Sequence, residues 1–269
     1  MASYQQKESP MKTYVKLVLT ATLTVFATAA VAENPFAGTW KFDASKSKVT
    51  GHTVTFTTES AGTIQVTAEG QSYSFKPDGS AAKTPFGDTV VWTKIDDSTW
   101  KAVYTKDSTV LDTDIWKLAV DGKSAEVSST GTKPNGDSFS ESETFARVTT
   151  GTGLFAKWKS TKVSNNAPDT RVIEANGDDG IIWNIPEMKA SLALKFDGKD
   201  VAPTGPTVPD GVTLSAKRIS PREFAIEEKM NGKAVWKGTN TVSADGKTLT
   251  QVGSPAGVSE PTTAVYQKQ

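Results

Sequence analysis

The strongest candidate for catalytic chemistry is a stretch of alternating residues near the middle of the chain. In a β-strand, Glu141 and Glu143 share one face with Phe139, Phe145 and Arg147. Alternate strand residues lie roughly 6.5 to 7 Å apart, which is within the range of paired catalytic carboxylates. If this face lines a protein interior, one glutamate could have a raised pKa and act as an acid. We expect the face to be solvated, because glutamate is rarely buried without a partner.

A second carboxylate pair and a single histidine complete the titratable candidates. Asp112 and Asp114 are spaced like the two glutamates, and the same solvated interpretation applies to them. His52 is the only histidine, so sites built from several histidines are excluded and one candidate base for neutral pH remains. Since His52 follows a glycine at the start of an expected strand, we expect it to be exposed and inert.

Motifs for other chemistries are missing. The chain has no cysteine, which excludes thiolate metal sites, cysteine nucleophiles and disulfides. It contains neither a Gly-X-Ser-X-Gly elbow nor a glycine-rich phosphate loop. The oxygen-rich residues 176–180 (Asn-Gly-Asp-Asp-Gly) lack the spacing of a calcium loop and are better explained as a β-turn. We therefore expect no metal and no cofactor.

The chain is rich in large aromatic side chains, which line many apolar ligand pockets. Such residues are also common in packed cores, where each contributes roughly 150 to 250 Å² of burial. Either role fits the six candidate ligand-binding residues, Trp92, Trp100, Tyr104, Trp116, Trp183 and Trp236.

The elements that must position these residues are β-strands. Apolar and polar residues alternate with period two in many short segments, which end at Gly, Pro, Asn or Asp. The segments are residues 54–57, 64–68, 73–75, 90–92, 100–104, 116–120, 139–148, 192–196, 212–214, 224–226, 234–236 and 265–268. Because no convincing amphipathic helix appears, the chain is expected to be all-β.

Two features of the chain recur at a spacing of about half its length. Phe-Ala-Gly-Thr-Trp at residues 36–40 is followed by Leu-Phe-Ala-Lys-Trp at 154–158, and Asp-Gly-Lys occurs at both 121–123 and 245–247. This repetition predicts a duplicated module, with one barrel at residues 33–149 and another at 150–269. The small, flexible residues 149–153 would be the linker.

The N-terminus has the pattern of an export signal. Lys12 and Lys16 precede an apolar run at residues 17–29, and Ala-Val-Ala at 30–32 supplies the small residues of a cleavage site. An uncleaved anchor is the alternative, although the run is shorter than the roughly 20 residues that span a bilayer. Cleavage after residue 32 would leave 269 − 32 = 237 residues in the periplasm or outside the cell.

The balance of charged residues indicates which partners the protein is expected to bind. Thirty basic residues offset thirty acidic ones, so no net field would attract nucleic acid or an anionic membrane surface. We expect a monomer that binds no nucleic acid and does not insert into a membrane once the signal is removed.

Gly38-Thr39-Trp40 resembles the Gly-X-Trp signature of the lipocalin superfamily, and Arg147 resembles that family's closing basic residue. The resemblance implies that Trp40 packs against Arg147, and that Trp158 and Lys268 form the second pair. A cation over an indole adds roughly 0.5 to 2 kcal/mol to the apolar burial.

The second copy departs from the signature, since alanine replaces its glycine. The residue pattern is also similar to that of exported bacterial lipocalin-like proteins, most of which have no assigned function.

These observations predict an all-β chain of two tandem antiparallel lipocalin-like β-barrels after a signal peptide. The first functional hypothesis is a protein that binds a small apolar or amphipathic molecule in a barrel cavity. The alternatives are a hydrolase or lyase that uses barrel-lining carboxylates, with Glu141 and Glu143 as catalytic residues, and a structural module of the cell envelope.

Overall fold

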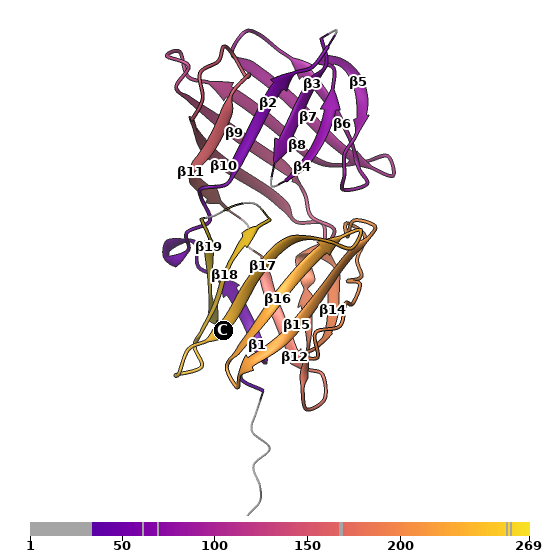
Figure 1. The fold of residues 1–269 in the computed structure, drawn as a ribbon, viewed down its shortest axis with the longest axis vertical. Coiled ribbons are helices and arrows are strands. Elements are labelled where there is room, and N and C mark those ends of the chain that lie inside the picture. Colours follow the sequence, from indigo (N-terminus) through magenta and orange to yellow (C-terminus); the bar gives the residue numbers. More distant parts are fainter. Residues whose placement is uncertain (1–33, 61, 69, 167–168, 257, 259) are drawn as a thin grey trace, which may run out of the picture. The chain divides into compact units, whose positions relative to one another are not determined.

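The chain folds into two antiparallel β-sheets, each curled into a nearly closed barrel (Figure 1). The computed structural model describes residues 34–60, 62–68, 70–166, 169–256, 258 and 260–269. The expected signal peptide, residues 1–32, lies outside the described residues. The all-β, two-barrel fold class expected from the sequence is confirmed.

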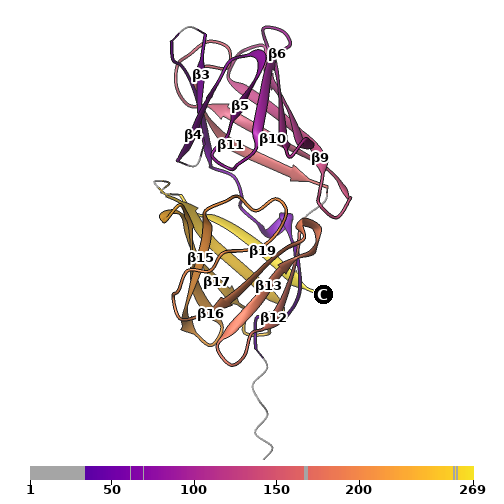
Figure 2. The same ribbon diagram turned by 90° about the vertical axis from the view of Figure 1, so that its right-hand side faces the viewer.

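Barrel A is the nine-stranded sheet, in the order β14-β13-β12-β1-β19-β18-β17-β16-β15. Its strands are β1 (Gly38–Phe42), β12 (Thr170–Ala175), β13 (Gly180–Ile185), β14 (Ala190–Lys195), β15 (Val212–Ser220), β16 (Glu223–Met230), β17 (Lys233–Val242), β18 (Thr248–Pro255) and β19 (Thr262–Lys268). Figure 2 shows β12 and β13 in one wall of this barrel and β15 to β17 in another.

Barrel B is the ten-stranded sheet, in the order β4-β3-β2-β11-β10-β9-β8-β7-β6-β5. Its strands are β2 (Thr53–Thr58), β3 (Ile64–Ala68), β4 (Gln71–Phe75), β5 (Asp78–Lys83), β6 (Thr89–Lys94), β7 (Thr99–Lys106), β8 (Thr109–Leu118), β9 (Ser124–Thr132), β10 (Ser138–Arg147) and β11 (Lys157–Asn165). Two short 3-10 helices, η1 (Ala44–Lys46) and η2 (Pro186–Met188), are the helical elements of the described chain.

The alternation of apolar and polar residues in the sequence gives each strand one face toward the barrel interior and one face toward solvent. In β16, Phe224, Ile226 and Met230 are buried, and the residues between them are more exposed. Asn231 and Gly232 both have positive φ, 50° and 77°, and join β16 to β17 in the tight turn that these residue types favour. Local sequence chemistry thus sets both strand orientation and hairpin register.

The opening strands of the two repeats are exchanged between the barrels. β1 lies between β12 and β19, whereas β11 lies between β10 and β2 (Figure 1). Barrel B is consequently the continuous segment from β2 to β11, inserted between the first two strands of barrel A. The boundaries 33–149 and 150–269 therefore leave β1 and β11 outside the sheet of their own half, which corrects the division expected from the repeat.

The expected linker at residues 149–153 is also corrected by this topology. It belongs to the connection between β10 and β11, which pair directly inside barrel B. A short connection between antiparallel strands favours pairing of those strands over a crossing to a second sheet. The chain passes between the barrels after β1 and again after β11.

Each repeat uses the same indole contact to seal its barrel. Trp40 and Trp158 are both fully buried. The Trp40 Nε1–H group donates to the carbonyl of Phe36 at 2.8 Å, and the Trp158 Nε1–H group donates to the carbonyl of Leu154 at 2.9 Å. The two hydrogen bonds span the same number of residues, so the duplication extends to this contact.

The cations over the two indoles are exchanged relative to the expected pairs. Lys268 Nζ lies 5.3 Å from the ring centroid of Trp40, and the Arg147 guanidinium carbon lies 4.3 Å from that of Trp158. In the sheets, Trp40 is opposite Lys268 and Trp158 is opposite Arg147. The predicted pairs Trp40–Arg147 and Trp158–Lys268 are wrong, because the opening strands have changed places.

We predict that Trp40→Ala lowers the free energy of unfolding by about 3–5 kcal/mol, the range for truncating a large buried side chain. Hydrogen–deuterium exchange should show lost amide protection in β12 to β19. Trp158→Ala is the matched variant, and its losses should fall in β2 to β10. Loss of protection in β2 to β10 for the Trp40 variant would contradict the strand exchange.

Candidate functional site

Barrel A contains a cavity of about 570 Å³. Its walls are mainly apolar, and they include Trp183, Leu192, Ile226, Trp236 and Ala264. Two charged residues, Arg171 and Glu228, also border it. Every strand of barrel A from β12 to β19 therefore contributes side chains to one hollow interior.

One wall of this cavity is a tryptophan laid over glycines. A Cβ atom added to Gly238 on β17 or Gly253 on β18 would collide with the indole of Trp236. The two residues face each other across the sheet. Glycine at both positions lets the indole lie flat against the strands, which keeps the interior open.

Arg171 brings a positive charge to the cavity. Its guanidinium carbon lies 5.6 Å from the ring centroids of both Trp183 and Tyr266. Arg171 Nη2–H also donates to the Tyr266 hydroxyl oxygen at 3.3 Å. The aromatic rings of β13 and β19 thus hold the cation in place through their quadrupoles.

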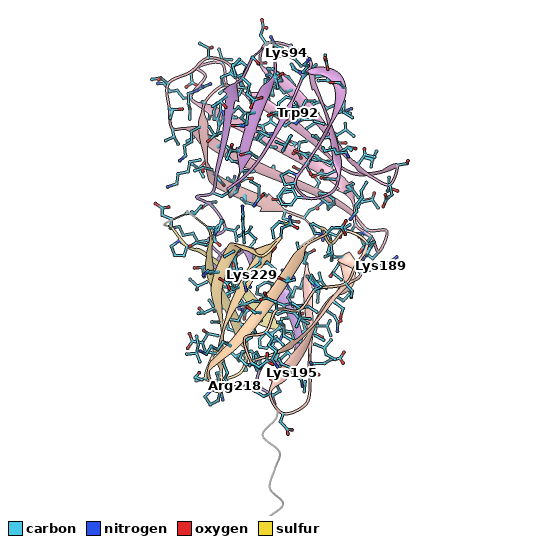
Figure 3. All side chains as sticks on the ribbon, turned by 45° about the vertical axis from the view of Figure 1, so that its right-hand side comes forward. Trp92, Lys94, Lys189, Lys195, Arg218 and Lys229 are labelled. Carbon is cyan, nitrogen blue, oxygen red and sulfur yellow. The ribbon has the colours of Figure 1, made fainter. Side chains whose placement is uncertain are left out.

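The interior of barrel B is filled with aromatic side chains. Trp92, Trp100 and Trp116 are all at least 95% buried. The Trp92 ring stacks on Phe75 at a centroid distance of 4.6 Å, and the Trp116 ring packs edge to face on Phe56 at 5.1 Å. Figure 3 shows Trp92 among the strands of this barrel.

The six candidate ligand-binding aromatics therefore separate into two groups. Trp183 and Trp236 line the cavity of barrel A. Trp92, Trp100 and Trp116 belong to the core of barrel B, and Tyr104 packs against that core.

The two candidate catalytic glutamates point into barrel B. Glu141 and Glu143 occupy the same face of β10 as Phe145, which is 2% exposed. The Glu141 carboxylate accepts a hydrogen bond from Asn165 Nδ2–H at 3.0 Å. Burial, and then the charge of Glu143, raise the pKa of Glu141. The expected solvated face is corrected, because each glutamate finds a partner inside the barrel.

Asp112 and Asp114 on β8 face the same interior. The Ser129 hydroxyl donates to Asp114 at 2.5 Å, and Asp114 hydrogen-bonds to Asp112. Burial, followed by the charge of Asp112, raises the pKa of Asp114 to about 7. Burial also raises the pKa of Asp112. The pair holds a shared proton near neutral pH, which again differs from the solvated interpretation.

His52 is neither exposed nor isolated, contrary to expectation. Its Nε2 atom lies 3.0 Å from a carboxylate oxygen of Glu143, and the two side chains are only 23% and 16% exposed. The imidazole also packs edge to face on Phe145 at 5.6 Å. The segment between β1 and β2 thus places His52 beside the carboxylates of β10.

Two tyrosines form the far edge of this polar group. The hydroxyls of Tyr73 and Tyr104 are 3.3 Å apart, and Trp92 Nε1–H donates to Tyr73 at 3.1 Å. Burial raises the pKa of both phenols. We call Asp112, Asp114, Glu141, Glu143 and His52 the interior carboxylate cluster.

Neither barrel offers a metal centre in the described part of the chain. No group of three or more histidine or carboxylate side chains there is arranged to hold a metal ion. Residues 176–179 form the turn between β12 and β13, as expected, and Gly180 begins β13. Asp179 in this turn pairs with Arg218 Nε at 2.6 Å.

The sequence predicted a ligand cavity in a barrel but did not include Arg171 in its lining. Arg171 has the same strand parity as the buried Ile173, so an arginine on the apolar face of a strand was the available signal. The sequence did not indicate which barrel would be hollow, because the open volume depends on side chains from eight strands.

Comparisons with protein-family models, with curated proteins and with solved structures found no match. The two nearly closed antiparallel barrels are consistent with a lipocalin-like fold. Within the described residues, no helix has the length and apolar character needed to cross a membrane.

We predict that the free energy of unfolding falls as the pH rises from about 4 to about 7, because an unfolded aspartate titrates near 3.9 and Asp114 near 7. In this window the folded protein binds more protons than the unfolded chain. Asp114→Asn should flatten the fall in denaturant titrations. Asp97→Asn, at a fully exposed side chain, should leave it unchanged. Parallel profiles for wild type and Asp114→Asn would contradict the raised pKa.

Proposed function

We propose that the protein is an exported lipocalin-like binding protein that holds a small apolar or amphipathic molecule in barrel A. The observation that carries this proposal is the cavity of about 570 Å³. Its volume lies within the roughly 300–1,000 Å³ of small-molecule sites. A predominantly apolar wall with a few polar groups is also typical of such sites.

The sealing contacts support the lipocalin-like assignment. A buried tryptophan from an opening strand and a cation from a closing strand meet in each barrel. The basic and apolar residues at the N-terminus support export to the periplasm or the medium. We further propose that the mature protein is a monomer.

A second candidate function is a hydrolase or lyase that works in barrel B. The observation that favours it is the interior carboxylate cluster, in which the pKa of Asp114 is about 7. A buried carboxyl group that titrates near neutrality can donate or accept a proton in a reaction. A cavity of about 290 Å³ is bordered by Asp112 and Glu141, which supports substrate access.

We predict that filling the cavity abolishes ligand retention. Native mass spectrometry of the protein purified gently from an exporting host should reveal a stoichiometric apolar adduct. Ala264→Phe places a ring in the cavity and should reduce the bound fraction at least tenfold. Thr241→Phe introduces the same side chain at an exposed position of β17 and should retain the adduct. Absence of any adduct from wild type, with no uptake of added apolar probes, would contradict the proposal.

For the second candidate, we predict turnover of chromogenic esters or glycosides by wild type. Glu141→Gln should lower the rate by about 10²-fold or more, since positioned acids and bases contribute about that much. Thr161→Gln, at an exposed position of β11, is the control. Full activity in the Glu141→Gln, Glu143→Gln double variant would place the reaction elsewhere, and an inactive wild type would reject this candidate for those substrates.

A further inference from the structure

The cavity of barrel A contains hydrogen-bond donors that lack an acceptor. Arg171 Nε and Trp183 Nε1 are both inaccessible to solvent and have no hydrogen-bond partner among the described residues. Both residues line the cavity, and the Trp183 side chain is 93% buried. Leaving a buried donor unpaired costs about 1–3 kcal/mol, and more when the group is charged.

Arg171 also lacks a counterion. Among the ion pairs of the described part of the chain, none involves Arg171. Its neighbours Trp183 and Tyr266 supply aromatic faces, which do not neutralise a full charge. A partly buried guanidinium in this setting favours an anion that can accept two N–H bonds.

Tyr266 holds the Arg171 guanidinium from the core of barrel A. Its hydroxyl oxygen accepts a hydrogen bond from Arg171 Nη2, and its side chain is not part of the cavity lining. Tyr266 is 5% exposed. The guanidinium and the indole therefore present N–H groups to the cavity from two paired strands, β12 and β13. We call Arg171 and Trp183 the donor pair.

The remainder of the cavity selects an apolar body. Trp236 offers a flat indole wall over its two glycines, and Leu192 and Ile226 contribute aliphatic surface. Glu228 on β16 places one carboxylate in the lining. The rest of the lining is mainly apolar and favours an apolar ligand body.

We infer that barrel A binds an organic carboxylate with a headgroup that is held by the donor pair and an apolar body that fills the rest of the cavity. This inference rests on the proposed binding function and specifies its ligand class. The headgroup takes the two donors that the protein leaves unpaired and neutralises Arg171. The apolar body covers the indole of Trp236.

The test compares three probes with the same apolar chain and different heads: dodecanoate, dodecanol and dodecylammonium. Binding to the full mature protein is measured by isothermal titration calorimetry. Wild type should prefer dodecanoate over dodecanol by about 10- to 100-fold, the equivalent of one charge-assisted hydrogen-bond pair. Dodecylammonium should bind weakest, because its charge has the same sign as Arg171.

Arg171→Gln should remove the preference for the carboxylate and leave dodecanol affinity within a few-fold of wild type. Arg171→Lys keeps the charge but not the planar fork, so it should retain part of the preference. Arg218→Gln is the matched control, since Arg218 also lies over an aromatic ring, Phe196, at 4.2 Å. Arg218 does not border the cavity, and Figure 3 shows it at the same end of barrel A as Lys195.

The outcomes separate the two proposals. Equal affinity for dodecanoate and dodecanol in wild type overturns the carboxylate assignment but leaves the binding function in place. Failure of all three probes to bind overturns both for ligands of this size. If Arg171→Gln unfolds, Arg171→Lys and the wild-type probe series still decide the question. An undiminished carboxylate preference in a folded Arg171→Gln protein rejects the donor pair.

Discussion

Each barrel is closed by an indole that lies beneath a cation from a neighbouring strand, Lys268 on β19 in barrel A and Arg147 on β10 in barrel B. The strand that carries the tryptophan lies between two others: β1 between β12 and β19, and β11 between β2 and β10. The contact therefore joins three strands at one point. It provides full burial of the largest side chain, an internal hydrogen bond and a cation–π interaction. Without this plug, each sheet would expose the base of its interior to water.

Above these similar seals, the two interiors have diverged. Barrel B fills its space with stacked indoles and phenyl rings, and places a group of protonatable side chains beside them. Barrel A uses Gly238 and Gly253 to press one indole against its wall, which leaves an open volume. The same duplicated scaffold thus supports a packed polar interior in one copy and a hollow apolar interior in the other.

The predictability of the structure follows from the range of each interaction. Strand alternation and Asn-Gly or Asp-Gly turns are local signals, so the all-β fold and hairpins such as Asn231-Gly232 could be predicted. The strand exchange could not, because both opening segments carry the same apolar and tryptophan pattern and fit either barrel.

The candidate sites were less predictable than the fold. The inward orientation of Glu141 and Glu143 depends on Asn165 and His52, which come from other strands and loops and are invisible to a rule about isolated glutamates. The position of Arg171 was equally hard to predict, since its aromatic partners come from two different strands. Charges inside a barrel are stabilised by tertiary partners, and a single sequence does not reveal those partners.

The insertion of barrel B between β1 and β12 also sets an order of assembly. As the chain emerges from its N-terminus, all ten strands of barrel B are present before β12 to β19 have appeared. Barrel B can therefore complete its sheet early, from contacts between neighbouring strands. β1 is the first strand to emerge, yet its partner β19 is the last, so it must wait through almost the whole of synthesis. During that interval the large side chain of Trp40, which is fully buried in the folded protein, is a natural binding point for a chaperone.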